Sequence, residues 1–339
     1  MPKMRLLFLC RAGTEIGFGH LIRSRTLAET ASTLHTVQMI VIGNDSVKSL
    51  LKNQPYSLQI VNTEDEVLKY VSGGYCAAIF DTMELTRGTV EAIQRISEIC
   101  VSICPVFNQM EQMHLLFNRT KYILSEYLGL RLKKYLGIQY TLVQKACTKI
   151  PSDLFERNLE ADRLNIAVSM GGGDAPNRTL RYLSHLRNCK TPFTFWIMLG
   201  EGYSHSFDDL VGALERDSVH EIVLAKTNAS MWHILRNCSL AILPGGVTLY
   251  EAAYAGLPTA TMFDSEDQQF LARELVEAGV SQSFGIVNED GFAKMNDFLT
   301  RLNSSRSILK GMHSNALTLI DGMGGNRILQ KIEEELSSR

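Results

Sequence analysis

Short apolar runs alternate with amphipathic segments along the whole chain. In the first half, each apolar run leads into a turn, often containing glycine, and then into residues with helical spacing. Strands are predicted at 4–10, 37–42, 58–61, 76–80 and 101–107, and helices at 20–34, 64–71 and 89–100. Strands that alternate with helices predict right-handed β-α-β units and a parallel sheet.

The alternation returns after a polar, proline-containing stretch at 148–163, which we expect to link two domains. Strands are predicted at 164–170, 193–199, 221–224, 240–243 and 259–263, helices at 176–188, 207–214, 229–237 and 268–278, and two or three helices close the chain. The pattern is less regular between 108 and 150. We therefore expect an α/β protein of GT-B type, with two Rossmann-like doubly wound domains (1–150 and 151–339) facing each other across a cleft.

Composition and charge narrow the classes of protein. Hydrophobic residues make up 45% and charged residues 21% of the 339 positions, as in soluble globular proteins. The 34 basic and 36 acidic side chains give a net charge of -2, which argues against a nucleic-acid partner. The seven cysteines are scattered as in a cytoplasmic protein with reduced thiols, and no apolar stretch reaches the roughly 20 residues of a transmembrane segment. The oligomeric state stays open.

One stretch, AILPGGVTLYEAAYAGLPT at 241–259, reads as a strand, a glycine turn and a helix start. Free N–H groups and the positive end of the dipole at a helix N-terminus attract phosphate. We expect the backbone from Gly245 and Gly246 to Val247 and Thr248 to hold a diphosphate, while Glu251 accepts hydrogen bonds from a ribose. An ordinary strand-to-helix turn is the alternative.

A second stretch, GTEIGFGHLIR, follows the first predicted strand. Gly17 and Gly19 are expected at the ligand, and His20 falls where a helix begins. The positive end of the dipole disfavours an imidazolium, so the sequence predicts a neutral His20 that acts as a general base near pH 7. Arg23 lies one turn further on and is expected at the same site. The alternative for His20 is capping or packing.

A third stretch, VSMGGGDAPNRT, carries Gly171, Gly172 and Gly173 after a strand. The three glycines allow the backbone to contact an anion or a sugar ring. Asp174 is a further candidate for the ligand, but capping of the next helix is the stronger interpretation for it and for Asn177, taken singly.

Together these motifs resemble a known family. G-x-G-H with arginine three positions on, S-x-G-G-x-D-x-x-N-x-T and P-G-G-x-T-x-Y-E-A-x-x-x-G-x-P resemble the UDP-sugar hydrolase of the pseudaminic acid pathway (UDP-2,4-diacetamido-2,4,6-trideoxy-beta-L-altropyranose hydrolase). They are also similar to spore-coat polysaccharide biosynthesis proteins and, more distantly, to MurG-like glycosyltransferases of GT-B fold. The resemblance implies UDP binding mainly by the C-terminal domain, with Gln268 as part of the pattern. It also implies His20 as the catalytic base or water-positioning residue, with no metal and no cofactor besides the UDP-sugar substrate.

Two segments differ from the family pattern. The family has an acidic segment after the fifth strand, where this chain has ICPVFN at 103–108. The second departure is YTLVQK at 140–145. Three hypotheses follow: a UDP-sugar hydrolase of surface-glycan or nonulosonic acid synthesis, a metal-independent glycosyltransferase of surface polysaccharide, or a non-catalytic nucleotide-sugar-binding protein.

Overall fold

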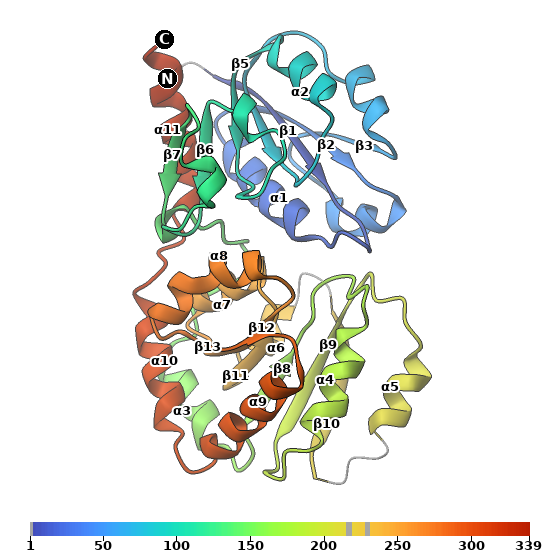
Figure 1. Cartoon of the computed structure of the whole chain (residues 1–339), viewed down its shortest axis with the longest axis vertical. Helices are drawn as coiled ribbons and strands as arrows, with labels where there is room; N and C mark the ends of the chain where they lie inside the picture. Colours follow the sequence, from blue (N-terminus) through green and yellow to red (C-terminus); the bar gives the residue numbers. More distant parts are fainter. Residues whose placement is uncertain (1–2, 215–218, 228–230) are drawn as a thin grey trace. The chain divides into compact units, whose positions relative to one another are not determined.

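The computed structural model describes residues 3–214, 219–227 and 231–339 and divides into two compact units. Unit 1 comprises Met1–Gln144 together with Asp321–Arg339, and unit 2 comprises Lys145–Ile320. The sequence-based division at residue 150 left 321–339 with the second half, whereas in the structure this segment belongs to unit 1. Both units are drawn in Figure 1.

Unit 1 is built on a parallel sheet of seven strands in the order β3-β2-β1-β4-β5-β6-β7. The strands are β1 (Arg5–Arg11), β2 (Thr36–Ile42), β3 (Ser57–Val61), β4 (Tyr75–Asp81), β5 (Ser97–Ser102), β6 (Leu115–Asn118) and β7 (Lys133–Leu136). The chain moves outward from β1 to β3 and then returns to the other side of β1 with β4. The carboxyl ends of β1 and β4 are therefore the topological switch point of unit 1.

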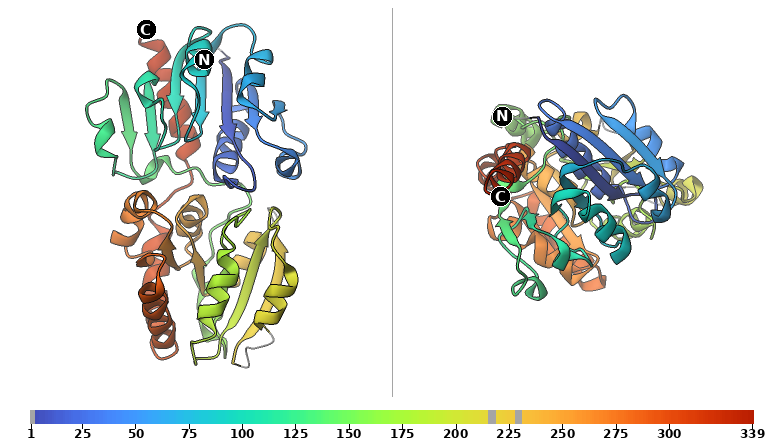
Figure 2. Two further views of the ribbon diagram at one scale, coloured as in Figure 1. Left: turned by 45° about the vertical axis from the view of Figure 1, so that its right-hand side comes forward. Right: turned by 90° about the horizontal axis from the view of Figure 1, so that it is seen from above.

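Helices and loops cover both faces of this sheet. They are α1 (Gly19–Ala31), η1 (Asp45–Leu51), η2 (Glu64–Lys69), α2 (Arg87–Gln94), η3 (Met110–Gln112), η4 (Ser125–Tyr127), η5 (Ile138–Tyr140) and α11 (Gly324–Ser337). On one face, α1 and α11 bury apolar side chains against the strands, including Leu21, Leu27, Ile328 and Ile332. The other face packs against η2, α2 and the segment from 107 to 132. The red helix α11 is seen along the sheet of unit 1 in Figure 2.

Unit 2 repeats the architecture with six parallel strands in the order β10-β9-β8-β11-β12-β13. The strands are β8 (Asn165–Val168), β9 (Thr194–Gly200), β10 (Glu221–Thr227), β11 (Leu240–Leu243), β12 (Thr259–Phe263) and β13 (Ser281–Ile286). The helices are α3 (Ser152–Glu160), α4 (Arg178–Leu186), α5 (Phe207–Leu214), α6 (Met231–Leu235), α7 (Val247–Ala255), α8 (Glu266–Glu277), α9 (Glu289–Leu302) and α10 (Ser307–Leu317). Its switch point lies between β8 and β11. The predicted helix at 229–237 begins outside the described residues.

Several predicted elements differ from the structure. The stretch expected to be a linker contains α3, because Phe155 and Leu159 lie four residues apart and bury the same helix face. Residues 97–100, predicted as the end of a helix, are the start of β5, where Ile99 pairs with Ala77 of β4. The strands β7 and β13 were not predicted, since their sequences KKYL and SQSFGI carry polar residues within short runs. Over the described ranges, no helix is long and apolar enough to cross a membrane.

Candidate functional site

The switch point of unit 1 brings His20 to Asp81. Asp81 is the last residue of β4 and pairs in register with Cys10 of β1. From the end of β1 the chain turns through a loop closed by a bridge between Gly13 and Gly17, in which Gly17 has φ of +87°. His20, the second residue of α1, therefore stands at the end of the strand that neighbours β4.

The Asp81 carboxylate is fully buried and is surrounded by donors. His20 Nδ1 lies 2.7 Å from Asp81 Oδ1, and Arg23 Nε donates to Asp81 Oδ2 at 2.8 Å. Arg23 Nη2 donates to Asp81 Oδ1 as well, and Ser24 Oγ donates to Oδ2 at 3.3 Å. A buried carboxylate is tolerated only when it is paired and hydrogen-bonded in this way. Arg23, expected at the ligand, thus has Asp81 as its partner and is itself 8% exposed.

The protonation predicted for His20 is wrong. Burial by itself lowers the pKa of His20, but the charge of the Asp81 carboxylate, the interaction with Cys104 and the hydrogen bond between Nδ1 and Asp81 outweigh burial and raise the pKa to about 9. The helix dipole places only about half an elementary charge at the N-terminus, whereas Asp81 supplies a full negative charge in contact. Burial raises the pKa of Asp81, but the charges and hydrogen bonds of Arg23 and His20 lower it more strongly. The pair is therefore an imidazolium beside a carboxylate near pH 7.

Cys104 completes this cluster. It lies two residues beyond the end of β5, the strand that pairs with β4, and is 2% exposed. Its Sγ donates to the carbonyl oxygen of Val106 at 2.8 Å, and its sulfur interacts electrostatically with His20 and Arg23. Three elements of unit 1, namely α1, β4 and the segment after β5, therefore converge on one point.

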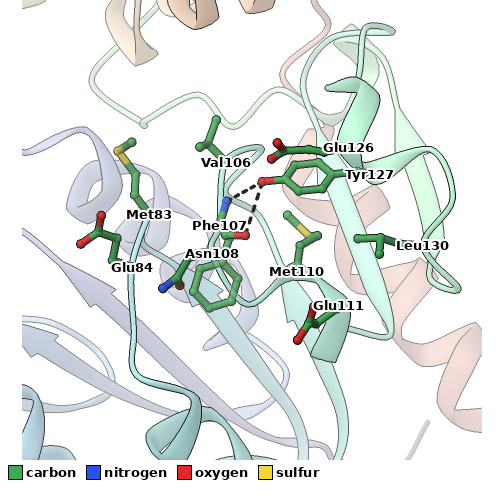
Figure 3. Close-up of a pocket in the computed structure, with 10 residues that line it drawn as sticks. All are labelled: Met83, Glu84, Val106, Phe107, Asn108, Met110, Glu111, Glu126, Tyr127 and Leu130. Atoms are coloured by element: carbon green, nitrogen blue, oxygen red, sulfur yellow. Dashed lines mark hydrogen bonds between the residues drawn. The ribbon is translucent and has the colours of Figure 1, made fainter.

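A cavity of about 370 Å³ lies next along the same two segments of unit 1 (Figure 3). Met83 is two residues beyond Asp81, and Val106 is two residues beyond Cys104. Tyr127 Oη accepts a hydrogen bond from the Phe107 N–H at 3.1 Å and so fixes the cavity wall. The lining has an apolar base and acidic side chains, and it comprises Met83, Glu84, Val106, Phe107, Asn108, Met110, Glu111, Glu126, Tyr127 and Leu130.

The switch point of unit 2 carries the glycine turn that leads into α7. The N–H of Ser169, just after β8, donates to Ile242 of β11 at 3.1 Å, so the two loops leave the sheet side by side. A Cβ on Gly245 would lie 2.8 Å from Phe263 Cδ1 and 3.1 Å from Gln268 Cβ. A side chain at this position would require Phe263 to shift. The structure thus places Gln268 beside Gly245, two residues that the sequence assigned to one site.

The start of α7 has no side-chain cap from the residue before it, and its second turn carries a buried carboxylate. Gly246, the residue before the helix, has φ of +154°. Because glycine has no side chain, it gives no capping hydrogen bond to the first N–H groups of the helix, at Val247 and Thr248. Glu251 is the fifth residue of α7 and is 1% exposed. A carboxylate buried to this degree is not a surface side chain, and burial of that kind requires hydrogen-bonding partners.

The triple-glycine loop caps α4. Asp174 Oδ1 accepts from the N–H of Arg178 at 2.8 Å and Oδ2 accepts from the N–H of Thr179 at 2.9 Å, so the capping interpretation of Asp174 is confirmed. For Asn177 it is wrong, because its side chain gives no cap and accepts instead from Tyr203 Oη at 2.9 Å. The loop also approaches β9 closely, because a Cβ on Gly200 would overlap the backbone of Gly172. Its neighbours Gly171 and Gly173 lie at the same carboxyl end of β8.

Sequence reasoning missed two members of the unit 1 site, Asp81 and Cys104, and one ion pair of unit 2. Asp81 ends the apolar run CAAIFD, and an acidic residue directly after a buried strand is the signal that indicates it. Cys104 gave no signal, since its neighbours in the chain are apolar. In unit 2, the ion pair between Arg178 Nε and Asp264 Oδ1, at 2.7 Å, links the start of α4 to the end of β12. It joins segments far apart in the sequence.

Comparisons with curated proteins give remote relatives. No family model matches the chain. It is 20% identical over 282 residues to an uncharacterised protein of Methanocaldococcus jannaschii, a match that covers 78% of this chain and 57% of that protein. It is 24% identical over 207 residues to the spore coat polysaccharide biosynthesis protein SpsG of Bacillus subtilis, covering 59% of each. The chain thus spans less than two thirds of the length of these relatives.

Solved structures show the fold. The MurG structure of Acinetobacter baumannii has a TM-score of 0.67 and 16% identity, over 98% of this chain and all of that one. A putative UDP-N-acetylglucosamine 2-epimerase of Listeria monocytogenes has a TM-score of 0.62 and 14% identity, over 100% and 98%. Staphylococcus aureus MnaA in complex with UDP has a TM-score of 0.61 and 12% identity, over 98% and 97%. These neighbours confirm the GT-B fold class, with two Rossmann-like domains of parallel sheets, and the chain is a remote relative of a polysaccharide biosynthesis protein.

Proposed function

We propose that this chain processes a UDP-sugar, with the nucleotide bound by unit 2 and the reaction carried out at His20 of unit 1. The observation that carries the proposal is the hydrogen-bonded pair of His20 and Asp81 at the switch point of unit 1. Ligands of doubly wound sheets bind outside the carboxyl ends of the strands at such a point. The remote relationship to a polysaccharide biosynthesis protein and the fold shared with MnaA, whose structure holds UDP, support the same substrate class.

Hydrolysis is the reaction that we propose first. A water attacks the anomeric carbon, the bond from that carbon to the diphosphate oxygen breaks, and UDP leaves with the electron pair. Asp81 holds Nδ1 of His20, so Nε2 is the nitrogen that takes the proton from the water. The donors at the start of α7 stabilise the charge on the leaving diphosphate. This step requires neutral His20, so its rate increases as pH rises towards about 9.

The same donor site also serves a glycosyltransferase, in which an acceptor hydroxyl replaces water. The cavity favours this second candidate, because it is lined by the residues that follow Asp81 and Cys104 in the chain and could take a group other than the nucleotide. A nucleotide-sugar-binding protein without turnover is the third candidate. The site would then bind the UDP-sugar without cleaving it.

One assay separates the three candidates. Purified protein is incubated with a panel of UDP-sugars, with and without candidate acceptors, and both UDP and free sugar are measured. Release without an acceptor supports hydrolysis, release only with an acceptor supports transfer, and binding without release supports the third candidate.

A pair of histidine variants assigns the site. His20→Ala abolishes turnover and leaves UDP binding within about twofold, whereas His233→Ala, a change at an exposed position of α6, keeps the wild-type rate. Circular dichroism establishes that both variants are folded. A fully active His20→Ala protein would remove His20 from the mechanism.

A further inference from the structure

Three side chains in unit 1 combine the donor types of a transition-metal site. His20, Asp81 and Cys104 each offer one ligand atom, and these atoms all lie within 4.8 Å of one another. Asp81 and Cys104 are buried, and His20 is partly buried. Among the residues that the structure describes, no other group of three histidine, cysteine or acidic side chains meets in this way.

The donors select a class of metal. A thiolate and an imidazole are soft and borderline ligands that suit Zn²⁺, whereas Mg²⁺ and Ca²⁺ prefer oxygen ligands alone. Zn²⁺ binds such atoms at about 2.0 to 2.3 Å, which puts tetrahedral ligands roughly 3.5 Å apart. The three atoms lie within 4.8 Å of one another, so shifts of roughly an ångström would bring them to that spacing. Three protein ligands leave the fourth position to water.

We propose that His20, Asp81 and Cys104 form a binding site for Zn²⁺, and that the bound ion blocks the reaction at His20. The binding itself is independent of the proposed function, whereas the block rests on it. When the ion binds, a sulfur–metal, a nitrogen–metal and an oxygen–metal bond form, the proton of the Cys104 thiol passes to solvent, and its hydrogen bond to Val106 is lost. Any proton on the coordinating nitrogen of His20 is released as well.

Arg23 limits the affinity of this site. Its guanidinium donates to both oxygens of Asp81, and its positive charge opposes a second cation. A carboxylate has about four acceptor positions, and His20, Arg23 and Ser24 occupy all four at Asp81. When the ring nitrogen of His20 binds the ion, its hydrogen bond to Oδ1 is given up, and Asp81 can then hold Arg23 and the metal ion together. The ion therefore binds reversibly and more weakly than in a closed structural site of four cysteines and histidines.

Cobalt provides a direct test, because Co²⁺ occupies zinc sites and its bond to a thiolate produces an absorption band in the near ultraviolet. Protein stripped with a chelator is titrated with Co²⁺ in the absence of any nucleotide. The wild-type chain is expected to develop the band with one equivalent of metal, and Zn²⁺ is expected to abolish it by displacement. No band at a tenfold excess of Co²⁺ would overturn the proposal.

Matched variants locate the site. Cys104→Ser loses the band, while Cys238→Ser, a change at a buried thiol of unit 2, keeps it. His20→Ala keeps the Cys104 side chain but is expected to bind Co²⁺ at least tenfold more weakly. This result tests the site even if Cys104→Ser does not fold. Equal bands in the Cys104→Ser and wild-type proteins would refute the assignment. Zinc binding without inhibition of an active enzyme would refute only the block. Because metal binding is measured without substrate, failure of the zinc site and failure of UDP-sugar turnover are distinguished.

Discussion

Asp81→Asn is expected to lower the pKa of His20 strongly. The substitution keeps the size of the side chain and removes its charge. Without the carboxylate, burial still acts against an imidazolium and the interaction with Cys104 is what remains in its favour. The pKa of His20 then falls from about 9 towards its ordinary value of 6.5.

The size of the effect follows from the two values. About 9 against 6.5 is a difference of about 2.5 pH units, which corresponds to about 3 kcal/mol of preference for the charged ring in the folded chain. Because the folded pKa is the higher one, this stabilisation is complete below about pH 6.5 and is lost as pH rises through about 9. The variant lacks that pH dependence.

Proton NMR of the His20 ring, recorded across pH 5 to 10 with a chelator present, measures both pKa values directly. Thermal unfolding of the wild-type and variant chains across the same range tests the linked stability, and circular dichroism at pH 7 verifies that Asp81→Asn is folded. A wild-type pKa of His20 at or below 6.5 would refute the reasoning by itself. An unchanged pKa of His20 in Asp81→Asn would also refute it.

Three further changes test the rest of the molecule. Glu251→Ala should weaken UDP binding by about 1 to 3 kcal/mol if the carboxylate accepts hydrogen bonds from ribose, and calorimetry showing no loss would free Glu251 from that role. Gly245→Ala places a Cβ 2.8 Å from Phe263 and should destabilise unit 2 by about 1 to 3 kcal/mol in a denaturant titration; an unchanged midpoint would mean that Phe263 moves aside at little cost. Ile332→Ala, in the core of unit 1, should cost about 2 to 5 kcal/mol of unfolding free energy, and a cost below 1 kcal/mol would show that α11 contributes little to that core.

The sequence predicted the two sheets because strands of a parallel sheet are buried on both faces and read as apolar runs. Most strands of both units follow this rule. The rule fails at β7 and β13, because these short strands contain polar residues and do not form continuous apolar runs. It also cannot assign α11, since an amphipathic helix shows which face is buried and not which sheet it covers.

The candidate site was predictable where the chemistry is local. The glycine loop before His20 and the turn before α7 are each readable from a few consecutive residues. The charge state of His20 was not, because its pKa is determined by Asp81, which lies 61 residues further along the chain. Cys104 and the Arg178–Asp264 ion pair also depend on which strands become neighbours. Local patterns therefore identify candidate groups, and sheet topology determines their state.

The return of the chain to unit 1 at Asp321 has a consequence for biosynthesis. Unit 2 is a continuous segment and can complete its core once Ile320 has left the ribosome. Unit 1 cannot, because α11 supplies Ile328, Leu329 and Ile332 to the face of the sheet that also packs α1. The half of the chain that is synthesised first is thus the half that finishes folding last, and until then the apolar surface beside α1 is a natural target for chaperones.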